Sequence, residues 1–429
     1  MFKKIIYHLI IVVVLSLTIK WVVDRIEDKN PIIKAISEIR FSDLYFSINN
    51  NLKPSSEIFI IDIGDKDPLK SREEIANFIE EINSKYKPKI IGVDVYFNSK
   101  YKDAPINSKL ISALSNENVI KMFKIDQTKG KDNKYQIYAD YSVLPALGKD
   151  SIFSREGQDG YTFGLGDPSD HTCVRYFKPV LELQVQKNKN NVKYHHFSKL
   201  IAKKYLEKSD KKFSSNINFD HKMMINYNID FSKNRIDIGD STRYNELKDK
   251  IVLIGVNTYK NGKPHYNDDV HFTPRNKNYI GRSEKDCYGI EILGTIVSNL
   301  INPNDALSYS PNFVYWLNKI LFLIIYIGIL YLFITLNESF IFFKILSQTL
   351  GVLFLVLISI ASIYYTKNYI DLSFSILMMF ISAELVEVIE ELLQRLPNYH
   401  KKLSQKFPIF FTKITKVSQN LLKSKATND

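Results

Sequence analysis

The chain has 429 residues, of which 45% are hydrophobic and 24% are charged, and its formal net charge is +12. This length exceeds what one hydrophobic core usually supports, so we expect at least two structural units. The lysines are scattered among asparagine, aspartate and glutamate through the middle of the chain, and this pattern argues against nucleic acid as a partner despite the positive charge.

The chain opens with an apolar segment. Lys3 and Lys4 precede a mostly apolar run from Ile5 to Val23. About 20 residues of helix cross a bilayer, and the positive charges that precede such a helix stay in the cytoplasm. Residues 1–23 are therefore predicted to be an uncleaved transmembrane signal anchor. A cleaved signal peptide is the alternative.

Residues 24–312 are predicted to form one α/β domain. Two short β-branched runs flank 68–86, in which the apolar residues recur at helical spacing. A strand, a helix and a second strand in this order predict parallel pairing with a right-handed crossover. A further helix is expected at 289–301. The predicted strands, which together favour a mostly parallel sheet, are 57–64, 88–97, 118–125, 222–229 and 249–256.

Three more apolar segments of membrane length lie within 313–389, at 313–336, 340–365 and 370–389. One helix before the domain and three after it place both termini in the cytoplasm and the 24–312 domain outside. Lysines dominate the 390–429 segment, in agreement with the rule that positive charge stays inside. We expect this segment to be a basic amphipathic cytoplasmic tail.

Four sequence segments carry a family resemblance. In order they are "FIIDIGDKD" at 59–67, "IIGVDVYF" at 90–97, "GLGDPSDHTCVRYF" at 164–177, and "LKDKIVLIGVNT" with "DDVHFTPRN" and "YGIEILGTIVSNLI" between 247 and 301. Together they resemble the second type of CHASE domain, an extracellular sensory domain that bacteria place before cyclases, kinases and other signalling outputs. The resemblance covers about residues 35–305. It implies a sensor in the bacterial cytoplasmic membrane.

The chain departs from the family at two places. The family's Trp-Pro-Trp-Pro-Arg stretch is replaced by "DPLKSR" at 67–72, which keeps only Arg72, and the Asp-Gly before the family's arginine is replaced by "DHTCVR" at 170–175. About 40 residues follow the last predicted helix, too few for a kinase or cyclase domain. We therefore expect no enzymatic activity and a separate cytoplasmic signalling protein as the partner. A homodimer is one arrangement that would transmit the signal.

The candidate ligand-binding residues are polar side chains within the matched segments. Strand ends in parallel sheets are common ligand sites, and carboxylates gathered there bind cations. The alternative is that these residues cap helices or bind loop amides. The candidates are Asp62, Asp65, Arg72, Asp94, Asp170, Arg175, Asp269 and Thr273.

Neither the small ligand, a metal nor a cofactor can be identified from these residues. A second hypothesis is a metal-assisted envelope hydrolase that uses Asp62, Asp65, Asp94 and Asp269, and a third is a structural membrane subunit. Cys173 and Cys287 are the only two cysteines, and an oxidising exterior would permit a disulfide between them. The sequence does not show whether they approach each other.

Overall fold

The computed structural model describes part of the chain. The described residues are 43, 45–46, 52–64, 68–95, 106–129, 135–140, 159–161, 173–184, 191–214, 217, 219, 222–260, 263–265, 269–275, 285–302, 311–336, 340–366, 369–372, 374–376, 379 and 386–388. The predicted signal anchor (1–23) and the tail (390–429) lie outside them, as does most of the predicted helix at 370–389.

The chain divides into two compact units. One contains described residues of Glu38–Val314 together with Ile358–Asp371, and the other contains described residues of Tyr315–Leu357 and of the segment from Leu372 onward. The first is a mixed α/β unit. The second consists of apolar helices.

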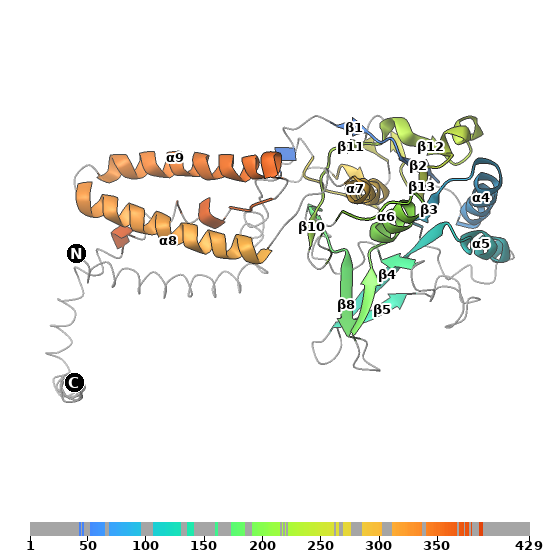
Figure 1. Ribbon diagram of the computed structural model, residues 1–429, viewed down its shortest axis with the longest axis horizontal. Helices are drawn as coiled ribbons and strands as arrows, with labels where there is room; N and C mark the ends of the chain where they lie inside the picture. The colour runs from blue at the N-terminus through green and yellow to red at the C-terminus, as the bar shows by residue number, and fades with distance from the viewer. Residues whose placement is uncertain are drawn as a thin grey trace, which may run out of the picture. The chain divides into compact units, whose positions relative to one another are not determined.

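A sheet forms the centre of the α/β unit (Figure 1). Five strands lie parallel in the order β12-β2-β13-β3-β4, and the far part of β4 pairs with β6 and β5. The bounds are β2 Ile58–Asp62, β3 Ile90–Val93, β4 Val119–Lys129, β5 Tyr135–Asp140, β6 Asp159–Tyr161, β12 Arg235–Asp237 and β13 Ile251–Gly255. The parallel sheet is thus confirmed, although β13 lies between β2 and β3, so the crossover from β2 to β3 skips one position.

One predicted strand is confirmed only in part. The 222–229 run does not join the central sheet. Its two ends pair separately, β10 (Met223–Met224) with β7 (Tyr176–Phe177) and β11 (Ile229–Asp230) with β1 (Lys53–Pro54). The remaining short strands are β8 Val180–Gln184, β9 Asn191–His195, β14 Tyr259–Lys260, β15 Lys263–Pro264, β16 Val270–His271 and β17 Cys287–Tyr288.

Helices cover both faces of the sheet, which explains why the central strands are apolar on both sides (Figure 1). Ile58 and Ile60 of β2 pack into the core beneath α6 and α7, whereas Phe59 and Ile61 pack into the core beneath α4 and α5. The bounds are α4 Pro68–Glu81, followed by a π-helical turn at Ile82–Tyr86, α5 Ile106–Leu114, α6 Phe197–Glu207 and α7 Gly289–Ile301. The predicted helix at 289–301 is confirmed.

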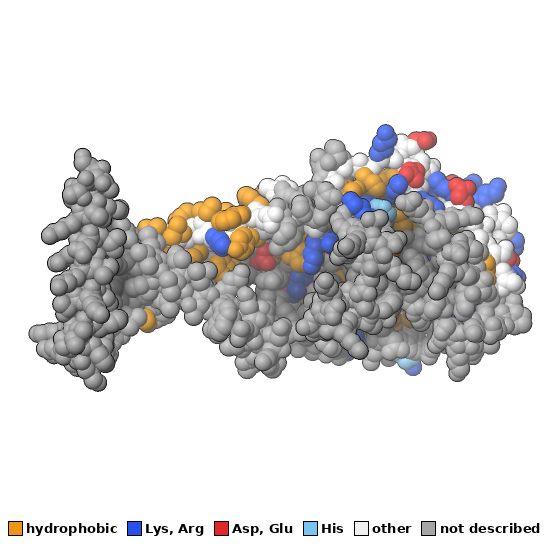
Figure 2. Space-filling view, turned by 90° about the horizontal axis from the view of Figure 1, so that it is seen from below, with side chains coloured by type: hydrophobic (Ala, Val, Ile, Leu, Met, Phe, Trp, Pro, Cys, Tyr) orange, Lys and Arg blue, Asp and Glu red, His pale blue; other side chains and the backbone are white. Residues whose placement is uncertain are grey.

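Two long apolar helices follow, α8 (Pro311–Leu336) and α9 (Phe340–Ala361), with a π-helical turn at Ser362–Thr366. By length and composition, their segments Asn312–Phe333 and Lys344–Thr366 qualify as membrane spans. Large apolar side chains along them are exposed, as expected of residues that face lipid. Figure 2 shows hydrophobic side chains gathered over this part of the chain, whereas most visible charged side chains lie over the α/β unit.

Polar contacts fasten the helical unit internally. The side chain of Asn318 on α8 accepts hydrogen bonds from the backbone N and the hydroxyl of Ser375, at 3.1 and 2.6 Å. Lys344 Nζ on α9 lies 3.1 Å from Glu387 Oε1. Both contacts join segments that lie far apart in the sequence, so they fix the register of the helices.

Candidate ligand cavity

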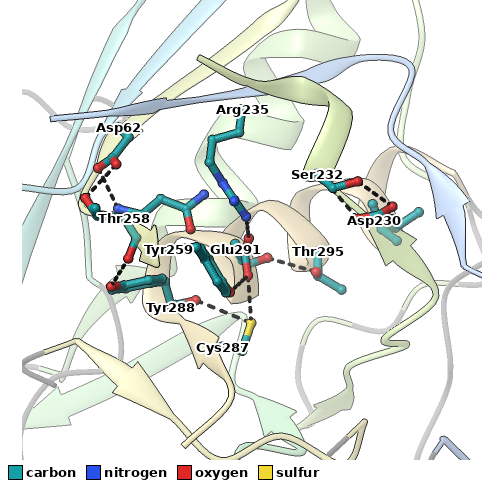
Figure 3. Close-up of polar contacts among 12 residues, drawn as sticks. Asp62, Asp230, Ser232, Arg235, Thr258, Tyr259, Cys287, Tyr288, Glu291 and Thr295 are labelled. Atoms are coloured by element: carbon teal, nitrogen blue, oxygen red, sulfur yellow. Dashed lines mark hydrogen bonds and ion pairs between the residues drawn. The ribbon is translucent and has the colours of Figure 1, made fainter. Parts of the chain in front are cut away.

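A cavity of about 250 Å³ lies within the α/β unit, between α7, the segment from Tyr227 to Arg235, the strand β14 that begins at Tyr259, and the loop that carries Arg275. Figure 3 shows polar side chains of its wall, among them Arg235, Tyr259 and Glu291, together with the neighbouring contacts of Asp62. We call it the Arg235–Glu291 cavity, after the ion pair in its wall. Tyr227, Ile229 and Phe231 give it an apolar side.

Glu291 is the central polar group of this cavity. It lies in the first turn of α7, where the helix dipole favours a negative charge, and it is 6% exposed. Its Oε1 accepts from Arg235 Nη2 at 2.8 Å, and its Oε2 accepts from the Tyr259 hydroxyl at 2.7 Å and from Cys287 Sγ at 3.3 Å. The carboxylate is therefore paired and hydrogen-bonded within the wall (Figure 3).

Arg235 is held on two sides. Its guanidinium carbon lies 4.1 Å from the centre of the Tyr259 ring, a cation–π contact. With the amide of Asn257 oriented to satisfy both of its neighbours, this side chain accepts from Arg235 Nε at 3.0 Å and donates to Glu291 Oε1 at 3.3 Å. Burial and the adjacent Glu291 raise the pKa of Tyr259 well above its ordinary value, so its hydroxyl remains a donor.

Asp62 supports the cavity from behind. It ends β2, and its carboxylate accepts from the backbone N of Gly64 and of Asn257, at 2.9 and 2.8 Å, and from the Thr258 hydroxyl at 2.6 Å. These bonds fix the loop after β13, which carries Asn257 and Tyr259 to Glu291. The alternative that Asp62 binds loop amides is confirmed, and its direct role in ligand binding stays a prediction.

Asp94 and Asp269 approach each other at the carboxyl end of β3. Burial raises the pKa of Asp94 well above its ordinary value, and the negative charge of Asp269 raises it further. Asp269 Oδ1 lies 3.2 Å from His271 Nε2, and its backbone carbonyl accepts from Gly289 N at 2.9 Å. Asp62 is two strand positions away from β3, a separation of about 10 Å, so the predicted carboxylates share one sheet edge without forming one cluster.

The other predicted site residues lie elsewhere. Arg175 forms a buried bidentate pair with Asp43, at 2.7 and 2.6 Å. Thr273 donates its backbone N and its hydroxyl to Asp286, at 2.7 and 2.6 Å. Arg72 is fully buried on α4, on the sheet face opposite α7. Asp65 and Asp170 lie outside the described residues.

Comparison with known proteins agrees with this α/β architecture. The model of the CHASE2 domain matches residues 9–334, more than half of the chain. The chain belongs to the CHASE2 domain family. CHASE2 domains are sensory, typically linked to signalling, and typically membrane-associated and extracytoplasmic. No catalytic family was detected, and no curated protein and no solved structure matches the chain significantly.

None of the six predicted site residues that the structure describes in this CHASE2 domain lines the Arg235–Glu291 cavity. Two of the residues missed, Arg275 and Glu291, stand inside segments that carry the family resemblance, "DDVHFTPRN" and "YGIEILGTIVSNLI". The signal for Glu291 is that it is the one charged residue in the predicted helix at 289–301. Arg235 begins a three-residue strand that has no periodic pattern around it, so nothing in the sequence singled it out.

The structure also bears on the cysteines and on metal binding. Cys173 and Cys287 are buried free thiols rather than a disulfide. Burial raises the pKa of Cys287 well above its ordinary value and the nearby Glu291 adds to this, so the thiol is protonated. Within the described part of the CHASE2 domain, no three His, Cys, Asp or Glu side chains are grouped so that they could hold a metal.

Proposed function

We propose that the protein is a membrane-anchored receptor. Its CHASE2 domain lies outside the cytoplasmic membrane, binds a small molecule in the Arg235–Glu291 cavity, and passes the bound state through four transmembrane helices to a separate cytoplasmic protein. The family membership and the two candidate spans support this proposal. The ligand, the partner, the orientation and the other two helices belong to the proposal alone.

The observation that carries it is the polar network in the cavity wall. A buried ion pair is weak evidence for stability, because apolar side chains of the same volume often stabilise a core as well or better. Here Arg235, Glu291 and Tyr259 contact one another around a space of about 250 Å³. Asn257 hydrogen-bonds to both charged groups from outside the cavity lining. Fixed polar groups beside an apolar wall are typical of a ligand site.

The connection along the chain suggests how binding would reach the membrane. Glu291 lies in the first turn of α7, and residues 302–310 separate the end of α7 from α8. A ligand shifts an equilibrium only if it prefers one of two states. We propose that these states differ in the position of α7, and that a homodimer interface amplifies the difference.

Blocking the cavity tests this proposal. Ser232 is exposed and lines the cavity, so Ser232→Trp should fill it with little effect on the core. Lys233→Trp adds the same bulk at the next, exposed position, outside the cavity lining, and is the matched control. The full chain in nanodiscs would be screened against small metabolites by thermal shift, because a ligand that binds only the folded state raises the midpoint of unfolding.

We expect compounds that stabilise the wild type and the Lys233→Trp variant and lose their effect in the Ser232→Trp variant. Ser232→Ala, which removes the hydroxyl without adding bulk, should keep the effect. Stabilisation that is equal in all four proteins, or found in none, would contradict a receptor cavity at this position.

A further inference from the structure

The cavity contains a second arginine, Arg275, which forms no ion pair with a carboxylate among the described residues. Its Nη1 donates to the backbone carbonyl of Ile229 at 3.2 Å, and within the described residues this is its one hydrogen bond. A guanidinium has five N–H donors. By contrast, Arg175, Arg235 and Arg243 each contact a carboxylate oxygen within 3 Å.

The carboxylates near Arg275 are engaged by other groups. Glu291 is held by Arg235 and Tyr259. Asp230 accepts from the backbone N and the hydroxyl of Ser232, at 2.9 and 2.8 Å. Asp286 attracts Arg275 electrostatically, but both of its oxygens accept from Thr273. None of the three comes within 4 Å of the Arg275 guanidinium in an ion pair.

The remaining donors of Arg275 therefore suit a carboxylate supplied by a ligand. A planar guanidinium binds a carboxylate through two parallel hydrogen bonds. The wall contains two arginines and two carboxylates, Asp230 and Glu291, so its lining is neutral overall and a dianion would be the less favourable ligand. Among the described residues, no carboxylate forms an ion pair with Arg275. The apolar side formed by Tyr227, Ile229 and Phe231 can receive a hydrocarbon or aromatic body.

We infer that the Arg235–Glu291 cavity binds a small monocarboxylate, with the carboxylate on Arg275 and the apolar body against the Tyr227–Phe231 wall. The volume of about 250 Å³ lies below the range of about 300–1,000 Å³ of sites for drug-sized ligands, so the ligand is small. This inference rests on the proposed receptor function and specifies the chemical class of its ligand.

The test compares benzoate with benzamide, which has the same shape without the charge, and with inorganic phosphate. Affinities would be measured by calorimetry on the full chain in nanodiscs. Arg275→Gln removes the positive charge of this side chain, and Arg275→Lys keeps the charge without the planar fork. Lys260→Gln removes a positive charge from an exposed strand residue outside the cavity lining and is the control.

We expect benzoate to bind the wild type and the Lys260→Gln variant equally, to bind Arg275→Gln at least tenfold more weakly, and to bind Arg275→Lys with intermediate affinity. A tenfold loss is at the lower end of what a hydrogen bond to a charged group contributes. Benzamide should bind at least tenfold more weakly than benzoate. Circular dichroism of each variant would verify that it is folded.

Equal binding of benzamide and benzoate would overturn the inference, as would phosphate binding without benzoate binding or unchanged benzoate binding in Arg275→Gln. Failure of benzoate while other compounds lose their effect in Ser232→Trp would overturn the carboxylate assignment and leave the receptor function intact. If no compound at all distinguishes Ser232→Trp from Lys233→Trp, the receptor function fails and the inference with it.

Discussion

At the scale of single residues, Asp286 is a partly buried acid that makes the stability of the domain depend on pH. Burial raises its pKa from 3.8 to about 6, against the opposing effect of its hydrogen bonds from Thr273. The folded state therefore holds this proton more tightly than the unfolded state does. The resulting stability is fully present below about pH 4 and is lost as the pH rises to about 6.

Asp286→Asn should remove this dependence, because an amide cannot ionise and its oxygen still accepts from Thr273. Between pH 4 and pH 7, the free energy of unfolding of the variant should rise relative to that of the wild type by on the order of 3 kcal/mol. Each unit of pKa corresponds to about 1.4 kcal/mol. Amide hydrogen exchange of β2 and β13 as a function of pH would measure the difference. Asp94 has a raised pKa too, and its contribution cancels in this comparison.

The exposed Asp237 supplies the control for this experiment. Asp237→Asn should follow the wild-type pH profile, since its carboxyl is in solvent. If Asp286→Asn and the wild type show the same profile between pH 4 and pH 7, then Asp286 does not carry the dependence.

The sequence predicts the positions of the aspartates in the fold better than it predicts their hydrogen-bond partners. Asp62 and Asp94 were expected at the carboxyl ends of parallel strands, and both lie there. Their partners could not be predicted, because these depend on the paths of loops. Asp62 binds the loop after β13, almost 200 residues later in the chain, and no local pattern records this contact.

At the scale of elements, the glycine in "IIGVDVYF" permits helix α6 to pack closely on the sheet. A Cβ atom placed on Gly92 of β3 would lie 2.6 Å from Cδ1 of Ile201 on α6, 2.8 Å from Cδ2 of Leu253 and 3.0 Å from the Phe197 ring. All three side chains are completely buried, so they have little room to move.

Gly92→Ala should therefore destabilise the α/β unit by about 1–3 kcal/mol, the usual cost of overpacking a core. Gly239→Ala is the matched control, because a Cβ there meets nothing within 4 Å, and its effect should stay within about 0.5 kcal/mol. Hydrogen exchange of the β3 amides would report both values. Equal stability of the two variants would show that α6 can shift to accept the methyl group.

Strands and helices with strong periodicity were predictable, and their pairing was less so. The predicted helix at 289–301 and the strand that became β13 agree with the structure to within two residues at each end. The 222–229 run was predicted to be a buried strand. Met223, Met224 and Ile225 are indeed buried in the core. Hydrophobicity predicts such burial, but the backbone partners of a strand depend on distant segments.

At the scale of the whole molecule, the proposed receptor requires a route from the exported domain to the cytoplasm. Two of the four predicted crossings, α8 and α9, have the length and composition of membrane spans. The signal anchor and the basic tail remain predictions from charge and hydropathy alone. The tail is the segment where a cytoplasmic partner would dock. Its removal should affect the binding of this partner without affecting membrane insertion.

Deleting residues 397–429 should abolish recruitment of the cytoplasmic partner and leave the protein in the membrane fraction, since the predicted spans all precede residue 397. In-cell cross-linking of full-length and truncated chains, followed by mass spectrometry, would compare the captured proteins. The control is a full-length chain with Lys413→Gln and Lys416→Gln. These substitutions weaken the attraction of the tail to anionic lipid by about 1 kcal/mol per charge. A protein partner that docks on the tail should still be captured by this variant. Recovery of the same partners with the truncated chain would show that the signal leaves the membrane by another segment.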